Sequence, residues 1–178
     1  NETYYVDHTK PVTSLVYGTP FVGSDGYAKW ITSNTDVNLS ATDYFGFDHD
    51  SGVNFTKYRV TLMDGDGACE SAHSGCSEYS GKGNWTTVTD DVTFNIPETS
   101  CHLIEYYSVD MVNKTEVLNK DCVFVDNEAP EVVKNIDGNK ILMDENCTDD
   151  VCDYWITQDA QISLDCADVM PHPVGDVT

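Results

Sequence analysis

The stretch Asp36-Val-Asn-Leu-Ser-Ala-Thr-Asp43 has apolar residues at every second position, namely Val37, Leu39 and Ala41. Side chains of a β-strand point alternately to the two faces of a sheet, so this spacing predicts a strand with one buried face. Similar patterns surround it, and no stretch keeps a helical period for more than two turns. The strands that we expect are 12–17, 36–41, 55–62, 85–88, 92–96, 103–109 and 115–125. Seven short strands separated by turn residues predict an all-β domain, a β-sandwich.

Three segments of the chain occur twice. Asp36–Asp43 recurs as Gln161-Ile-Ser-Leu-Asp-Cys-Ala-Asp168, and Trp30-Ile31-Thr32 recurs as Trp155-Ile156-Thr157, both 125 residues later. Val6-Asp7-His8-Thr9-Lys10-Pro11 recurs 119 residues later, as Val125-Asp126-Asn127-Glu128-Ala129-Pro130. Self-similarity of this kind indicates a repeat architecture.

The repeat divides the chain into three parts. Residues 1–6 are expected to be the last strand of a preceding repeat, residues 7–126 one complete domain, and residues 127–178 the first half of the next domain. The six residues by which the two offsets differ fall where Cys147 and Cys152 lie, which predicts a loop insertion closed by a small disulfide. Half a sandwich leaves strand edges and an apolar face open. The segment is therefore expected to be cut from a longer protein or to be completed by another chain.

Three stretches resemble the tandem immunoglobulin-like repeats of bacterial and archaeal cell-surface proteins. Asp50-Ser-Gly-Val-Asn-Phe-Thr-Lys-Tyr-Arg-Val60 resembles their third strand, His102-Leu-Ile-Glu-Tyr-Tyr-Ser-Val-Asp-Met-Val-Asn113 their sixth strand and turn, and the Val-Asp-x-x-x-Pro block their linker. The family usually has glycine where Val112 stands and often lacks cysteines. The resemblance implies an immunoglobulin-like β-sandwich in tandem repeats. It leaves the function open, because such modules serve in surface layers, adhesins, filaments and secreted hydrolases.

The chain is strongly acidic, with 31 acidic residues, nine basic residues and a net charge of −22. A surface this negative repels phosphate backbones, so nucleic acid is not an expected partner. No apolar run reaches the roughly 18 residues of a membrane span. Self-repulsion of this size strains a compact state, and bound cations or a salty medium would relieve the strain.

Seven cysteines and six Asn-x-Ser/Thr sequons indicate an extracellular, oxidising location. We expect disulfides Cys69–Cys76, across a short loop, and Cys101–Cys122, across a hairpin turn centred on Met111 and Val112. Together with the small loop bridge, these pairs leave Cys166 over. The sequons predict N-linked glycans, although asparagine and threonine are also common in β-rich surface proteins. They lie at Asn1, Asn38, Asn54, Asn84, Asn113 and Asn146.

Aspartates are expected to converge where the linker meets the domain. In a sandwich of the expected type, the loops after the second and sixth strands lie at the same end as the incoming linker. That arrangement would bring Asp7, Asp43 and Asp110 together, with Asp48 and Asp50 nearby, and Asp126 with Asp168 at the next junction. Converging carboxylates favour calcium, which takes six to eight oxygen ligands. The alternative is that these aspartates only cap turns. A second acidic stretch, Asp64–Glu70, fits a turn better than a calcium loop.

No arrangement of catalytic residues stands out, so an enzyme is not expected. His73 and His102 have no nucleophile in a recognisable context. Trp30, Trp85 and Trp155 could form a sugar-binding platform, but packing is the better interpretation. We expect a structural module of a surface layer, sheath or filament that contacts copies of itself or adjacent repeats, and the sequons favour an archaeal surface. The alternatives are an adhesin stalk, a carbohydrate-binding module, or a spacer in a secreted enzyme.

Overall fold

The computed structural model describes residues 1–23, 29–44, 50–63, 76–143 and 153–168. These residues form strands and turns and no helix, which confirms the predicted all-β class. Asn1–Asn127 belongs to one compact unit, the first unit, and Glu128–Val169 forms another, the second unit.

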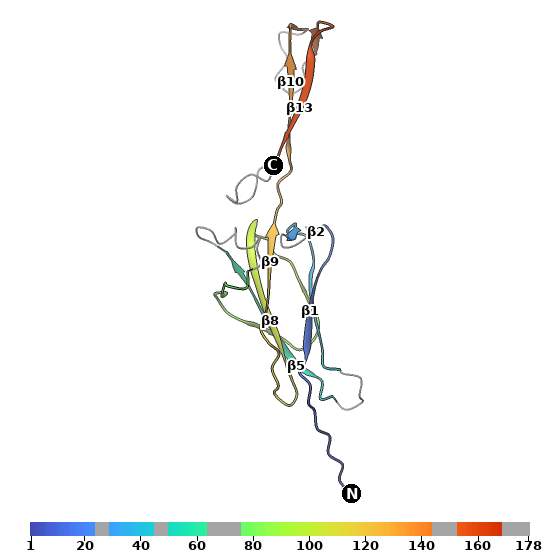
Figure 1. Ribbon diagram of the computed structural model, residues 1–178, viewed down its shortest axis with the longest axis vertical. Helices are drawn as coiled ribbons and strands as arrows, with labels where there is room; N and C mark the ends of the chain where they lie inside the picture. The colour runs from blue at the N-terminus through green and yellow to red at the C-terminus, as the bar shows by residue number, and fades with distance from the viewer. Residues whose placement is uncertain (24–28, 45–49, 64–75, 144–152, 169–178) are drawn as a thin grey trace. The chain divides into compact units, whose positions relative to one another are not determined.

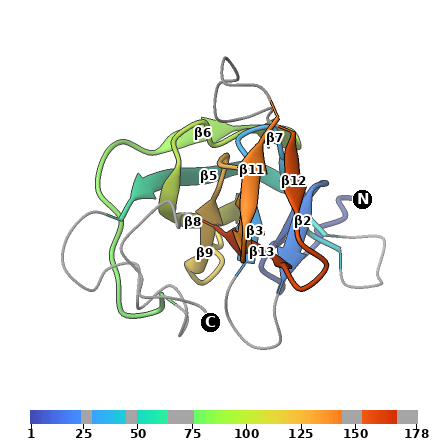
Figure 2. The ribbon, with the colours of Figure 1, turned by 90° about the horizontal axis from the view of Figure 1, so that it is seen from above.

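The first unit contains two open sheets. The smaller sheet has the strand order β1-β4-β7 and the larger sheet the order β2-β3-β9-β8-β5-β6 (Figure 1). Paired strands are antiparallel except β3 and β9, which run parallel. β6 lies beside β5 at one edge of the larger sheet (Figure 2). The bounds are β1 Val12–Tyr17, β2 Phe21–Gly23, β3 Lys29–Ile31, β4 Val37–Thr42, β5 Val53–Leu62, β6 Thr86–Val88, β7 Val92–Phe94, β8 Ser100–Asp110 and β9 Asn119–Val125.

One apolar core joins the two sheets. Val37 and Leu39 of β4 are buried, as the alternating pattern predicts, and Ala41 is half-buried. Its cluster of buried residues takes members from both sheets, and half-buried side chains such as Leu15 and Phe94 pack against it. The buried members are Ile31, Val37, Ile96, Ile104, Val123 and Val125. This arrangement is compatible with a β-sandwich.

A second cluster holds the disulfide. It contains Met63, Cys76, Cys101, Leu103, Cys122 and Phe124, with Trp30 and Tyr79 packed against it. Cys76 is bonded to Cys122 across 46 residues, so the predicted pairs Cys69–Cys76 and Cys101–Cys122 are wrong. Cys101 is also disulfide-bonded. Cys166 is free and exposed. Cys69, Cys147 and Cys152 lie outside the described residues.

The β8–β9 hairpin explains why the predicted bridge fails. The register pairs Cys101 with Phe124 and Cys122 with Leu103, two residues away from the register in which the two cysteines face each other. The connection is longer on the β9 side than the sequence predicts, because β9 begins at Asn119 and not at residue 115. The turn residue with left-handed backbone is Asn113, with φ 68°, a conformation that asparagine tolerates better than most residues.

The strands of the second unit pair in the same way as β1 with β4 and β2 with β3 in the first unit. β10 (Glu131–Asp137) pairs with β13 (Gln161–Ala167), and β11 (Lys140–Leu142) pairs with β12 (Tyr154–Ile156), all antiparallel. The registers agree residue by residue once the offsets of 119 and 125 are applied. Val12↔Thr42 becomes Glu131↔Ala167, and Phe21↔Ile31 becomes Lys140↔Ile156.

Residues 1–11 contain no strand, whereas residues 1–6 were expected to be one. The further assignment of the chain to repeats stays a prediction.

Candidate metal centre

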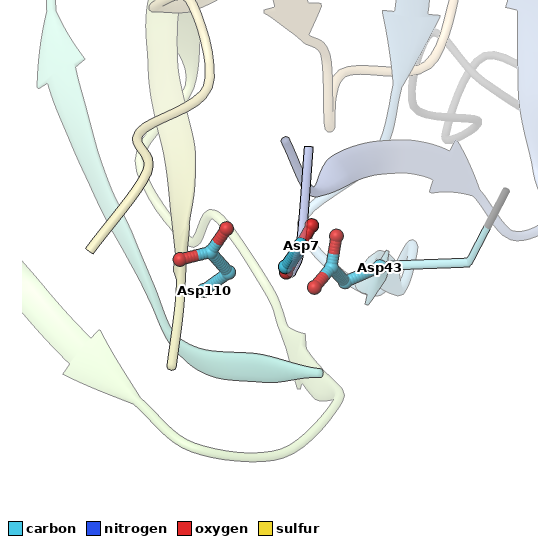
Figure 3. A group of neighbouring side chains, drawn as sticks. All are labelled: Asp7, Asp43 and Asp110. Atoms are coloured by element: carbon cyan, nitrogen blue, oxygen red, sulfur yellow. The ribbon is translucent and has the colours of Figure 1, made fainter. Parts of the chain in front are cut away.

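Three aspartates from distant parts of the sequence meet at one end of the first unit. Asp7 precedes β1, Asp43 directly follows β4, and Asp110 is the last residue of β8. The start of β1 pairs with the end of β4, and the start of β5 pairs with Asp110, so the sheet registers bring these positions to the same end. One carboxylate oxygen from each aspartate lies within 4.8 Å of the other two (Figure 3).

Asp110 divides its two carboxylate oxygens between two environments. Its Oδ1 accepts hydrogen bonds from the backbone N–H groups of Val112 (2.9 Å) and Lys114 (2.7 Å), as a turn cap does. Its Oδ2 is buried and has no hydrogen-bond partner among the described residues, and the residue as a whole is 0% exposed. A buried carboxylate oxygen without a partner is costly, and a bound cation would supply the missing partner.

Asp7 and Asp43 are held by donors from the linker and from the residues before β5. Asp7 Oδ1 accepts from the Thr9 N–H (2.8 Å), and Asp7 Oδ2 accepts from the Ser51 N–H (3.0 Å). Asp43 Oδ2 accepts from the Gly52 N–H (3.0 Å). The Thr9 hydroxyl lies 3.3 Å from Asp50 Oδ1, which places Asp50 beside the cluster. These backbone donors orient the carboxylates without neutralising their charge.

Among the described residues, the side chain of Lys114 reaches this cluster. Its Nζ donates to Asp7 Oδ1 at 3.1 Å and also to the Asp7 backbone carbonyl. The sequence analysis missed this lysine, because nothing in the spacing between residues 7 and 114 predicts the contact. One lysine leaves the charge of Asp7, Asp43 and Asp110 only partly compensated.

The pKa values of Asp43 and Asp7 are shifted in opposite directions. Burial raises the pKa of Asp43, and the negative charges of Asp7, Asp110 and Asp50 add to this, against the Gly52 N–H, which lowers it. The pKa of Asp7 is held well below its usual range, chiefly by the Ser51 and Thr9 hydrogen bonds. The ionised form is thus favoured at Asp7 and disfavoured at Asp43.

The donor set fits an oxygen-seeking divalent cation. Oxygens that bind calcium at 2.3–2.6 Å lie at most about 5 Å apart, which is compatible with the 4.8 Å spread of the three carboxylates. The described part of the cluster offers no nitrogen or sulfur ligand, so zinc does not fit. The turn-capping interpretation is confirmed for one oxygen of Asp110, whereas the calcium interpretation stays a prediction.

The other predicted metal ligands are placed less completely. Asp48 and the acidic stretch Asp64–Glu70 lie outside the described residues. Asp126 is half-buried in the first unit and Asp168 is exposed in the second, so this pair stays a prediction.

The sequons differ in accessibility. Asn1, Asn84 and Asn113 are exposed, Asn38 and Asn54 are half-buried within strands, and Asn146 lies outside the described residues. Exposed sequons are the sites open to a glycan, which stays a prediction.

The aromatic residues mostly pack within the protein. Trp30 stacks on Phe124 with ring centroids 4.5 Å apart, and Trp85 meets the edge of Tyr107. Trp155 is exposed. Packing explains the first two tryptophans, while the third, on β12, is not covered. His102 is buried, with Nδ1 3.2 Å from the Ser100 carbonyl, and burial lowers its pKa.

Comparisons with protein-family models, curated proteins and solved structures give no significant match. In the described residues we find no helix with the length and apolar character that crossing a membrane requires.

Proposed function

We propose that this chain is a structural, non-enzymatic module of a repetitive extracellular assembly, such as a surface layer, sheath or filament, and that calcium stabilises the junction where a linker enters each domain. The observation that carries the cation site is the buried Asp110 Oδ2 beside Asp7 and Asp43, which has no hydrogen-bond partner in the part of the chain that the structure describes. An acidic cluster alone would not support a site, because exposed carboxylates are common in so acidic a chain. A fully buried carboxylate oxygen that accepts no hydrogen bond from the described residues is uncommon, and it therefore points to a ligand.

Such a site would act by holding the linker and the two sheets together. Asp7 belongs to the linker, whereas Asp43 and Asp110 end strands of different sheets. A cation bound to all three would fix the linker to both sheets at once. It would also relieve the repulsion from neighbouring carboxylates, which adds to burial in raising the pKa of Asp43.

The tandem immunoglobulin-like organisation is part of the proposal. It is supported by the strand pairing of β10–β13, which reproduces the registers of β1–β4 at the offsets of the sequence repeat. The acidic composition and sequons support an extracellular location.

Calcium titration tests the site. We expect isothermal titration calorimetry to detect one site in the first unit and calcium to raise the melting temperature. A ligand at 100 times its dissociation constant stabilises a fold by about 2.7 kcal/mol, and EDTA should reverse the gain. Asp110→Asn should abolish both effects.

Asp91→Asn is the matched control, because it removes one exposed negative charge outside the cluster. It should leave calcium binding and the calcium-dependent rise in melting temperature intact. Equal losses in the two variants would show that calcium acts only by screening the net charge, and the proposed site would be refuted.

A further inference from the structure

Lys114 belongs to the same turn as Asp110. Its backbone N–H donates to Asp110 Oδ1 at 2.7 Å, and its carbonyl oxygen accepts from the Asp110 N–H at 3.0 Å. Asn113, directly before it, has the left-handed backbone of this turn. The backbone of Lys114 is therefore fixed beside one carboxylate of the acidic cluster of Asp7, Asp43 and Asp110, while its side chain extends to another.

The ammonium group of Lys114 contacts Asp7 at two atoms. Nζ lies 3.1 Å from Asp7 Oδ1 and also donates to the Asp7 backbone carbonyl. The side chain of Asp7 is 3% exposed, whereas that of Lys114 is 30% exposed. One positive charge thus stands at a cluster in which carboxylate oxygens of three aspartates lie within 4.8 Å of one another. Lys114 is a counter-ion of the cluster that the chain itself supplies.

Among the described groups that contact Asp7 Oδ1, the ammonium group of Lys114 withdraws most easily. The same oxygen accepts from the Thr9 N–H at 2.8 Å and lies 3.0 Å from the Thr9 hydroxyl. The backbone donor cannot leave without a change in the linker, whereas the hydroxyl oxygen can itself serve as a ligand. A lysine side chain is flexible, and its ammonium group is strongly hydrated. A second cation at Asp7 would also repel the ammonium group, since like charges a few ångströms apart destabilise each other.

We propose that calcium and Lys114 compete for the acidic cluster, so that binding of the ion displaces the lysine. The ammonium group then moves into solvent, and the ion takes its place at Asp7, beside Asp43 and the buried Asp110 Oδ2. The inference rests on the proposed calcium site and deepens it, because it names the residue that sets the affinity of that site. In the absence of the ion, Lys114 holds the linker on the domain.

Lys114→Met tests the exchange, because methionine keeps an unbranched side chain without the charge. Isothermal titration calorimetry on the full chain should show that this variant binds calcium at least about tenfold more tightly than the wild-type protein, within the usual range of coupling between two ligands. In EDTA the same variant should melt at a lower temperature, because Asp7 loses its counter-ion. A residue with a purely structural role would lower both the calcium affinity and the stability when it is replaced.

Lys134→Met is the matched control. Lys134 is exposed on β10 in the second unit, and its loss changes the net charge by the same amount. This variant should bind calcium and melt as the wild-type protein does. Equal gains in calcium affinity for the two variants would attribute the effect to the net charge and overturn the exchange.

Chemical labelling of lysines gives a direct readout of the displacement. Reductive methylation followed by peptide mass spectrometry should modify Lys114 faster in calcium than in EDTA, because the displaced ammonium group is in solvent. Lys134 should react at the same rate under both conditions.

The outcomes separate the exchange from the calcium site on which it rests. If Lys114→Met binds calcium as the wild-type protein does, or more weakly, the exchange is overturned and the calcium site stands, because the ion then binds beside the lysine. If neither protein binds calcium, the calcium site and the exchange are refuted together. Calcium binding by Lys114→Met alone would support the exchange and refute calcium as the stabilising ion of the wild-type chain.

Discussion

At the scale of single residues, one carboxylate can hold a turn and a ligand at once. Oδ1 of Asp110 accepts hydrogen bonds in the turn after β8, whereas its Oδ2 is buried and has no partner among the residues whose positions are described. Asp43 shows the cost of gathering such groups, because burial and neighbouring charges raise its pKa. The meeting of Asp7, Asp43 and Asp110 could be predicted from the sequence, since it follows from strand order. The sequence does not predict Lys114, whose contact with Asp7 depends on the conformation of the turn.

Asp43→Asn should have opposite effects with and without calcium. In EDTA at pH 7 it should raise the melting temperature, because it removes a disfavoured negative charge while an amide oxygen can still accept from the Gly52 N–H. With calcium, the variant should melt below the wild-type protein, because a ligand is lost. Differential scanning calorimetry under both conditions measures this reversal. A variant that is less stable than wild type in EDTA would show that Asp43 acts mainly as a structural hydrogen-bond acceptor.

At the scale of elements, apolar residues at every second position predict well where the strands lie. They predict poorly the register in which the strands pair. β1 was predicted with its observed bounds, and β4 with a shift of one residue. The short strands β2 and β3 were not predicted as strands, because three residues are too few to show a period. The β8–β9 register was wrong by two residues, since it was inferred from symmetry about a turn and not from the contacts that fix it. The predicted disulfide failed with it.

Removal of the Cys76–Cys122 disulfide should destabilise the first unit substantially. The loop-entropy relation gives about 4 kcal/mol for a separation of 46 residues. Cys76→Ala with Cys122→Ala should lower the free energy of unfolding in urea by an amount of this order. Cys166→Ala is the control and should change it by less than about 0.5 kcal/mol, because Cys166 is free and exposed. Non-reducing peptide mapping that joined Cys101 to Cys122 would contradict the register.

At the scale of the whole molecule, the similar sequence segments of the two units correspond to strand pairs with the same registers. The recurring Trp-Ile-Thr segment and the recurring Val-Asp-x-x-x-Pro segment give the offsets of 125 and 119 residues that the strand registers reproduce. The burial of equivalent positions could not be predicted in this way, because burial depends on the residues packed against a strand as well as on the strand itself. Ile31 is buried in a cluster with residues of β4, β8 and β9, whereas Ile156 is exposed.

The two units should therefore differ in local stability despite their shared registers. β8 is buried along most of its length, whereas β13 is exposed throughout, and backbone amides in strands with few buried contacts open at low free-energy cost. Hydrogen exchange followed by mass spectrometry should show amides of 131–137 and 161–167 exchanging well before those of 100–110. Calcium should slow exchange at the ends of β1, β4 and β8 and leave the second unit unchanged. Equal protection of the two units would contradict the exposure of β13 along its whole length.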